Sequence, residues 1–97
     1  MTDPTKLSGG QRFGQWILKG EAALGAGGNG EVWLAENSNG TKAALKFLHI
    51  ENIGTKRAMR FQDEILFLRK EKDRPGILSL IDAHTPDDRP WFSTPFS

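Results

Sequence analysis

The 97-residue sequence contains no cysteine and no tyrosine, and its charges nearly cancel. Without cysteine the chain can form no disulfide, no thiolate metal site and no cysteine nucleophile. Thirteen basic and twelve acidic residues give a net charge of +1, which provides no electrostatic attraction for nucleic acid or an anionic membrane. No apolar run approaches the roughly 18 residues that a membrane-spanning helix needs. The polar start lacks the apolar core of a signal peptide, so we expect a cytoplasmic protein.

The residues that are present have the composition of a folded domain, with 37% hydrophobic and 26% charged positions. Residues 1–12 show no hydrophobic periodicity and are predicted to form a flexible leader. Regular patterns begin at Phe13, and neither an internal repeat nor a second domain follows. Residues 13–97 are therefore predicted to form one domain.

Strand-like and helix-like patterns alternate in a definite order. Asn39-Gly40 supplies the positive φ that a tight hairpin turn requires. Phe61, Ile65 and Leu68 recur at the spacing of an amphipathic helix, for which Thr55 is the candidate N-cap. Strands are predicted over residues 16–24, 31–36, 42–48, 77–83 and 91–96. The order is three strands, one helix and two strands.

Four glycines in six residues follow the first predicted strand, and those at 25, 27 and 30 fit the pattern G-x-G-x-x-G. Such a hexad can be a plain turn, or it can let backbone N–H groups approach phosphate oxygens. A dinucleotide-binding fingerprint requires a helix directly after the loop, whereas a strand pattern follows here. A Walker loop requires Gly-Lys-Ser/Thr, whereas Glu31-Val32 follows Gly30. The local pattern therefore favours a strand–loop–strand flap.

Two charged residues fall where an isolated charge is unfavourable. Glu64 lies on the apolar face of the predicted helix, and Lys46 lies in the middle of the third predicted strand. Because an unpaired buried charge is costly, we predict that the two side chains pair. The alternative is that both are exposed at an edge. A paired lysine would be held near the glycine loop, where it can neutralise nucleotide phosphates.

Further motifs follow in the same order from residue 16 to residue 97. The run 24–32 reads L-G-x-G-x-x-G-x-V, Ala44-Leu45-Lys46 lies on the third predicted strand, and Glu64 lies in the helix. Residues 91–97 read as a strand that runs into a linker. Together these features resemble the N-terminal lobe of eukaryotic-like Ser/Thr protein kinases. The resemblance implies an α+β fold, a five-stranded antiparallel sheet with one αC-type helix.

The resemblance also implies that the chain binds ATP. Lys46 would contact the α- and β-phosphates, Glu64 would anchor Lys46, and Ala44 would offer a flat surface to adenine. The implied nucleotide-binding residues are Leu24, Gly25, Ala26, Gly27, Gly28, Asn29, Gly30, Glu31, Val32, Ala44, Lys46, Glu64, Thr94, Pro95 and Ser97.

Within this set, Leu24 and Val32 would close the pocket from the side of the glycine loop. Thr94 resembles the gatekeeper residue, and Pro95 and Ser97 resemble hinge residues that contact adenine through their backbones. Proline has no N–H but keeps its carbonyl, so Pro95 is compatible with that role.

The sequence departs from the family in what it lacks. It contains no H-R-D and no D-F-G motif, so no catalytic residue is assigned in this chain. ATP is the expected cofactor, and Mg²⁺ is expected only with the missing C-terminal lobe. His49 and His84 lack ligand spacing, so neither is assigned to a metal. The resemblance thus implies a truncated small lobe, inactive alone, whose full-length relative phosphorylates protein hydroxyls.

Two observations leave other possibilities open. Asn29 stands where the family often carries an aromatic residue at the tip of the glycine loop, which changes the shielding of the phosphates. Met59, Leu66 and Phe67 point outward from the predicted helix, and Phe96 lies near the end of the last strand. An apolar patch of this kind suggests an alternative function, a non-catalytic regulatory module that docks on another kinase.

Overall fold

The computed structural model of the chain describes residues 6–71, 80–84 and 89–96. Within these ranges the elements in chain order are β1 (Arg12–Phe13), β2 (Trp16–Leu18), β3 (Gly25–Ala26), β4 (Gly30–Glu36), β5 (Lys42–Leu48), η1 (Ile50–Asn52), α1 (Lys56–Lys70), β6 (Asp82–His84) and β7 (Trp91–Pro95). Residues 77–79 of the fourth predicted strand, and Ser97, lie outside the described residues.

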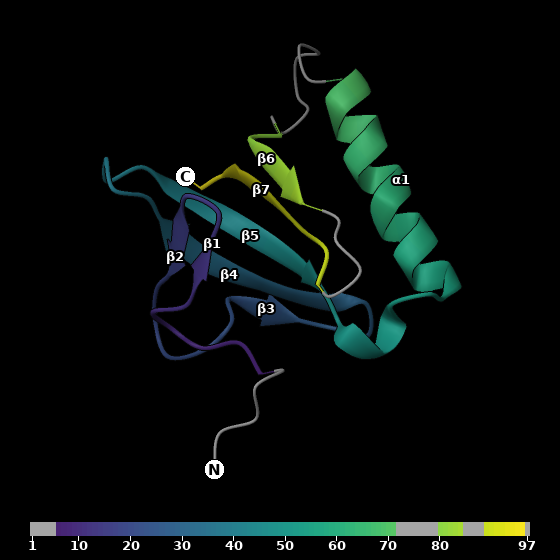
Figure 1. Cartoon of the computed structure of the whole chain (residues 1–97), viewed down its shortest axis with the longest axis horizontal. Coiled ribbons are helices and arrows are strands. Elements are labelled where there is room, and N and C mark those ends of the chain that lie inside the picture. Colours follow the sequence, from purple (N-terminus) through teal and green to yellow (C-terminus); the bar gives the residue numbers. More distant parts are fainter. Residues whose placement is uncertain (1–5, 72–79, 85–88, 97) are drawn as a thin grey trace.

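All strand pairs are antiparallel and form one sheet in the order β1-β2-β4-β5-β7-β6, with β3 paired to β4. Figure 1 shows α1 standing beside the part of the sheet that contains β6 and β7. The sheet curls, since β2 and β6 are separated by three strands in the sheet order and yet Trp16 of β2 donates its indole N–H to Asp82 Oδ2 of β6 over 2.8 Å. The predicted α+β class, an antiparallel sheet with one helix, is confirmed.

Of the first predicted strand, 16–24, the structure has only residues 16–18 as β2, and the next strand, β3, begins at Gly25 in the glycine-rich loop. The backbone N–H of Lys19 donates to the carbonyl of Leu34, and that of Leu24 donates to the carbonyl of Val32. Four residues, 20–23, lie between the two donors and only Trp33 lies between the two acceptors, so the chain between the donors bulges away from the sheet. Gly20, with φ of 94°, allows the turn at which β2 ends. The short strands β1 and β3 were not predicted, so the structure has seven described strands where the sequence predicts five.

The β4–β5 hairpin and α1 form where the sequence predicts them. In the hairpin turn the Asn37 side chain accepts the backbone N–H of Asn39 and of Thr41, both at 3.0 Å. Gly40 adopts a φ of 80°, as the Asn-Gly pair indicates. At the start of α1 the Thr55 hydroxyl accepts the backbone N–H of Arg57 at 3.2 Å. Both local predictions are confirmed.

The sheet carries a separate apolar cluster on each face. One cluster contains the tryptophans and alternate residues of β4 and β5, namely Leu7, Trp16, Leu18, Trp33, Ala35, Ala43, Leu45, Phe47 and Trp91. The other lies between the sheet and α1 and contains Leu48, Phe61, Ile65, Leu68 and Phe92. The predicted buried face of the helix is confirmed. Because side chains alternate along a strand, residues between those of the first cluster face the helix side.

Residues 7–12 pack against the sheet, so the predicted flexible leader is wrong for this segment. Leu7 is buried in the first apolar cluster, and the backbone N–H of Gly10 donates to the carbonyl of Leu18 over 2.8 Å. Arg12 and Phe13 form β1 on the edge of β2. Pattern analysis misses this segment because it contains one apolar side chain before Phe13 and several glycine and polar residues.

Candidate functional site

Two adjoining cavities open on the helix side of the sheet, beneath the glycine-rich loop. The first, of about 230 Å³, is lined by residues 25–32 and Lys46. The second, of about 300 Å³, is lined by Val32, Ala44, Lys46, Glu64, Leu68, Phe92 and Thr94. Val32 and Lys46 belong to both linings, so the two cavities meet at these side chains.

Strand register explains why distant parts of the sequence meet in the second cavity. Lys46 of β5 lies opposite Val32 of β4 and opposite Phe92 of β7. Ala44 lies two residues along β5, on the same face, and opposite Thr94. The predicted shared face of Ala44 and Lys46 is therefore confirmed. The small side chain of Ala44 leaves the floor of the cavity open.

Lys46 and Glu64 form the predicted ion pair. The ammonium Nζ lies 2.9 Å from Oε1 of Glu64 and 3.3 Å from Oε2. Both side chains are only half-buried, with 38% and 42% of their surfaces exposed, because they border the open cavity. The pair thus differs from the buried pair that the sequence suggests. It holds the ammonium group at the junction of the two cavities and contributes little to stability.

The glycines of the loop serve different structural purposes. A Cβ at Gly30 would overlap the carbonyl oxygen of Phe47, so the close approach of β4 and β5 requires glycine there. A Cβ at Gly25 or at Gly27 would meet no atom within 4 Å. The loop is closed by a hydrogen bond of 3.0 Å from the N–H of Gly27 to the carbonyl of Gly30. The packing of β4 against β5 therefore accounts for glycine at position 30. It does not account for glycine at positions 25 and 27, where a side chain would have open space.

The tip of the loop is tied to the segment that joins β5 to α1. His49 contacts the carbonyl of Gly27, and Asn52 donates to the carbonyls of Gly28 and Asn29. Neither His49 nor Asn52 was predicted as a site residue from the sequence. The one indication in the sequence was Asn29, which stands where the family usually has an aromatic residue at the loop tip.

Other predicted site residues are placed differently. The side chain of Leu24 is 54% exposed, and it lines neither cavity. Pro95 is exposed at the end of β7, and Ser97 lies outside the described residues. Leu68 and Phe92 line the second cavity, although neither was predicted there from the sequence. The sequence did not indicate that they line the cavity, because both also belong to the apolar cluster beneath α1.

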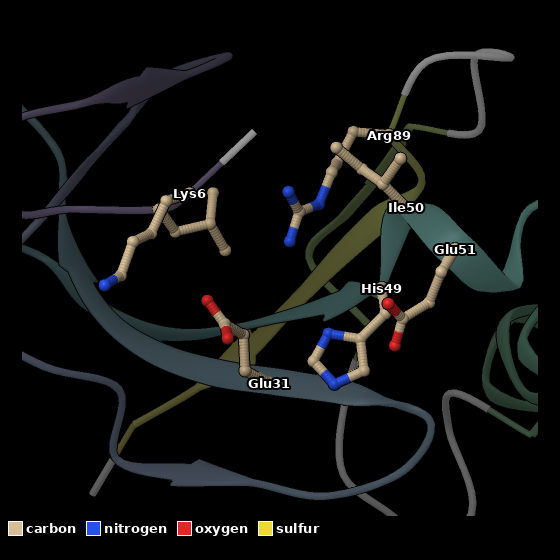
Figure 2. Close-up of a pocket in the computed structure, with 7 residues that line it drawn as sticks. Lys6, Glu31, His49, Ile50, Glu51 and Arg89 are labelled. Atoms are coloured by element: carbon tan, nitrogen blue, oxygen red, sulfur yellow. The ribbon is translucent and has the colours of Figure 1, made fainter. Parts of the chain in front are cut away.

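A third cavity, of about 350 Å³, lies near the start of β4 and the end of β5 and is lined in part by Leu7. Figure 2 shows the Arg89 guanidinium and the Glu31 carboxylate pointing into it from opposite sides. Burial lowers the pKa of Arg89, and the nearby carboxylate of Glu31 acts in the opposite direction. Glu31 also accepts the indole N–H of Trp33 at 2.8 Å. This cavity therefore faces the tryptophan side of the sheet, away from Lys46.

In the described ranges, no three acidic or histidine side chains gather as potential metal ligands. Nor is any described helix long and apolar enough to cross a membrane. On the outer face of α1, Met59, Leu66 and Phe67 are exposed by 67%, 59% and 48%, and Phe96 beyond β7 is exposed by 41%. The outward position of these apolar side chains agrees with the sequence-based expectation.

No protein-family model and no curated protein matches the chain. Solved structures match it over nearly its whole length. The kinase domain of PknI from Mycobacterium tuberculosis has a TM-score of 0.71 and 22% identity, over 94% of this chain and 36% of that one. A double mutant of that domain has a TM-score of 0.70 and 26% identity, over 94% and 36%. The apo form of PpkA-294 has a TM-score of 0.70 and 21% identity, over 95% and 39%.

The chain thus spans little more than a third of the length of these structures. Among the described residues, the antiparallel sheet, the helix α1, the glycine loop and the lysine–glutamate pair are the parts that the sequence resemblance implies. The chain has the α+β fold of the N-terminal lobe of a protein kinase domain.

Proposed function

We propose that the chain is the ATP-binding small lobe of a Ser/Thr protein kinase. The observation that carries the proposal is the position of Lys46, which lines both cavities and is held there by Glu64. A fixed ammonium group between an apolar cavity and a glycine-rich loop suits a ligand that joins a flat base to phosphates.

The second cavity has the chemistry expected for the adenine ring. Val32, Ala44 and Phe92 give it apolar walls, and Thr94 adds a hydroxyl on the β7 side. The first cavity is lined by the glycine loop, whose backbone N–H groups can approach phosphate oxygens without side chains in the way. In this arrangement, adenine lies between Val32 and Ala44, and the phosphates reach Lys46.

Phosphoryl transfer requires groups that this sequence does not contain. The family's catalytic aspartate and magnesium-binding residues belong to H-R-D and D-F-G motifs, and neither motif occurs among these residues. Transfer of phosphate to protein hydroxyls is therefore proposed for a longer protein that supplies a C-terminal lobe. The 97-residue chain by itself is expected to bind ATP without turnover.

Calorimetric titration of the purified chain with ATP, ADP and adenosine tests the proposal. We expect saturable binding of all three, with ATP bound more tightly than adenosine because Lys46 and the loop contact the phosphates. Absence of saturable binding at millimolar nucleotide would contradict the nucleotide-binding function. Measurable transfer of γ-phosphate by the chain alone would contradict the proposed need for a second lobe.

The exposed apolar side chains of α1 support the second candidate function, docking on another kinase. Met59 and Leu66 are more than half exposed, and Phe67 is nearly so. Sedimentation of the chain alone and with candidate kinases separates the two functions. A chain that stays monomeric and forms no complex with any candidate kinase would count against docking. That result would not bear on the proposed nucleotide binding.

A further inference from the structure

Three consecutive carbonyl groups at the tip of the glycine loop accept hydrogen bonds from the segment after β5. The imidazole Nε2 of His49 lies 2.7 Å from the carbonyl oxygen of Gly27. The amide nitrogen Nδ2 of Asn52 lies 2.9 Å from the carbonyl oxygen of Gly28 and 3.1 Å from that of Asn29. Because a carbonyl oxygen cannot donate, the His49 tautomer in this contact carries its proton on Nε2.

A third side chain reaches the tip from the first turn of α1. Nη1 of Arg57 donates to the side-chain oxygen of Asn29 over 3.0 Å. A Cβ built on Gly28 would lie 2.6 Å from the same Nη1, so the guanidinium packs directly against the backbone of the loop. The amide at position 29 therefore provides a contact that an aromatic side chain there could not make.

These contacts determine which way the N–H groups of the loop face. The peptide bonds of the described chain are all trans, so each carbonyl points opposite to the N–H of the following residue. The carbonyls of Gly27, Gly28 and Asn29 point toward His49 and Asn52, and that of Asn29 also accepts the backbone N–H of His49 at 3.0 Å. The N–H groups of Gly28, Asn29 and Gly30 consequently point away from that segment and remain available to an anion.

We infer that His49, Asn52 and Arg57 form a loop clamp that positions the backbone donors of the glycine loop for phosphate. This inference rests on the proposed nucleotide-binding function. A loop rich in glycine samples many conformations. The apparent affinity for a ligand is the intrinsic affinity multiplied by the fraction of time that the loop spends in the binding-competent conformation. His49 and Asn52 hold the loop through its backbone carbonyls, and Arg57 holds it through the Asn29 side chain, so all three are positioning residues.

Variants at Asn52 give the sharpest test, because its side-chain amide makes two of the contacts. Asn52→Ala removes the donor, and Asn52→Asp keeps the shape but places carboxylate oxygens against two carbonyls. His49→Gln retains an N–H donor and is the conservative counterpart of His49→Ala. Asn39→Ala, in the exposed hairpin turn, is the matched control for removal of an asparagine side chain.

The first measurement uses the ligand-free 97-residue chain. The Asn29 amide shares its peptide plane with the Gly28 carbonyl that Asn52 holds. We expect its NMR order parameter to fall in Asn52→Ala from about 0.85, typical of rigid backbone, toward about 0.6. His49→Ala should give a smaller fall, and His49→Gln should stay near the parent value. Unchanged order parameters in both Asn52 variants would overturn the clamp.

The second measurement compares ATP with adenosine in calorimetric titrations of folded variants. Loss of the clamp should weaken ATP binding by about threefold to tenfold, as expected for one or two exposed hydrogen bonds. Adenosine lacks phosphates, so its affinity should stay within about twofold of the parent chain. A mobile loop with an unchanged ratio of ATP to adenosine affinity would overturn the positioning role.

The two measurements separate failure of this inference from failure of the proposed function. If the parent chain binds ATP no more tightly than adenosine, the phosphate-binding function fails. The order parameters still decide whether Asn52 holds the loop, because they are measured without nucleotide. Equal losses of ATP affinity in Asn39→Ala and Asn52→Ala would also overturn the inference.

Discussion

The ammonium nitrogen of Lys46 lies 2.9 Å from Oε1 of Glu64, so an ion pair joins the central strand β5 to helix α1. Roughly two fifths of each side chain is exposed, and a pair of this kind adds at most about 1 kcal/mol to stability. Its importance lies in position, because the ammonium group stands where the two cavities meet.

Replacement of Lys46 by methionine should therefore separate binding from stability. Lys46→Met removes the charge but keeps a long apolar side chain beside Phe92, whose ring lies 5.8 Å from Nζ. We expect ATP affinity to fall by at least about tenfold, because a charge-assisted contact is lost. The free energy of unfolding should change by less than about 1 kcal/mol.

Titration calorimetry and thermal unfolding check both parts of this expectation. Lys42→Met, on the exposed end of the same strand, is the control for removal of a lysine. A Lys46→Met chain that binds ATP like its parent would remove the central support for the proposed function. Docking on another kinase, the second candidate function, should be nearly unaffected by either variant.

Replacement of two adjacent alanines of β5 by leucine should have different effects, one on ligand binding and the other on stability. Ala44 faces the second cavity, so Ala44→Leu should block both ATP and adenosine while the fold is retained. Ala43 is fully buried in the tryptophan-side cluster, so Ala43→Leu should lower stability by about 1–3 kcal/mol. Chemical unfolding and nucleotide titration of the two variants give the comparison. Retained adenosine affinity in Ala44→Leu would place the base elsewhere.

Two glycines of the loop should differ in their tolerance of alanine. In Gly30→Ala the new methyl group would meet the backbone of Phe47, and we expect a loss of about 1–3 kcal/mol of stability. At Gly25 the added methyl group has open space, so Gly25→Ala should change stability by no more than about 0.5 kcal/mol. Urea unfolding of both variants measures the difference. Equal stabilities would mean that β4 and β5 can separate locally at little cost.

Asp82 should stabilise the curl of the sheet through Trp16. The indole N–H of Trp16, in a side chain with 1% exposure, donates to Asp82 Oδ2. Asp82→Ala leaves this donor unpaired and should cost about 1–3 kcal/mol. Asp82→Asn keeps a carbonyl acceptor and should cost less. Thermal unfolding ranks the two variants, and the reverse ranking would show that the carboxylate charge matters more than the hydrogen bond.

The sequence predicts local structure best where short-range chemistry determines it. Asn39-Gly40 and the Thr55 cap depend on neighbouring residues alone, and the structure has both. The pairing of Lys46 with Glu64 is also predictable, because each charge lies in an apolar pattern that requires a partner. Their half-exposure was not predictable, since it depends on the volume of cavities formed by several strands.

Features that depend on long-range packing were missed for the same reason. Leu7 has no periodic neighbours in sequence, and its burial depends on a surface formed by β-strands that follow it. Asn52 is polar and lies between recognisable elements, so its role becomes visible only when the loop tip lies beside it. Leu24 shows the opposite error, because its place in a motif does not bring its side chain to the cavity.

All three tryptophans of the sequence lie in the apolar cluster on the face of the sheet opposite the proposed nucleotide cavities. Their exposures are 1% for Trp16, 3% for Trp33 and 5% for Trp91, so their indole rings are shielded from water in the folded chain. Intrinsic fluorescence will therefore report loss of this cluster on unfolding, and it will respond weakly to a ligand beside Lys46. The two properties of the chain, its stability and its nucleotide affinity, can be followed by independent optical and calorimetric signals on the same sample.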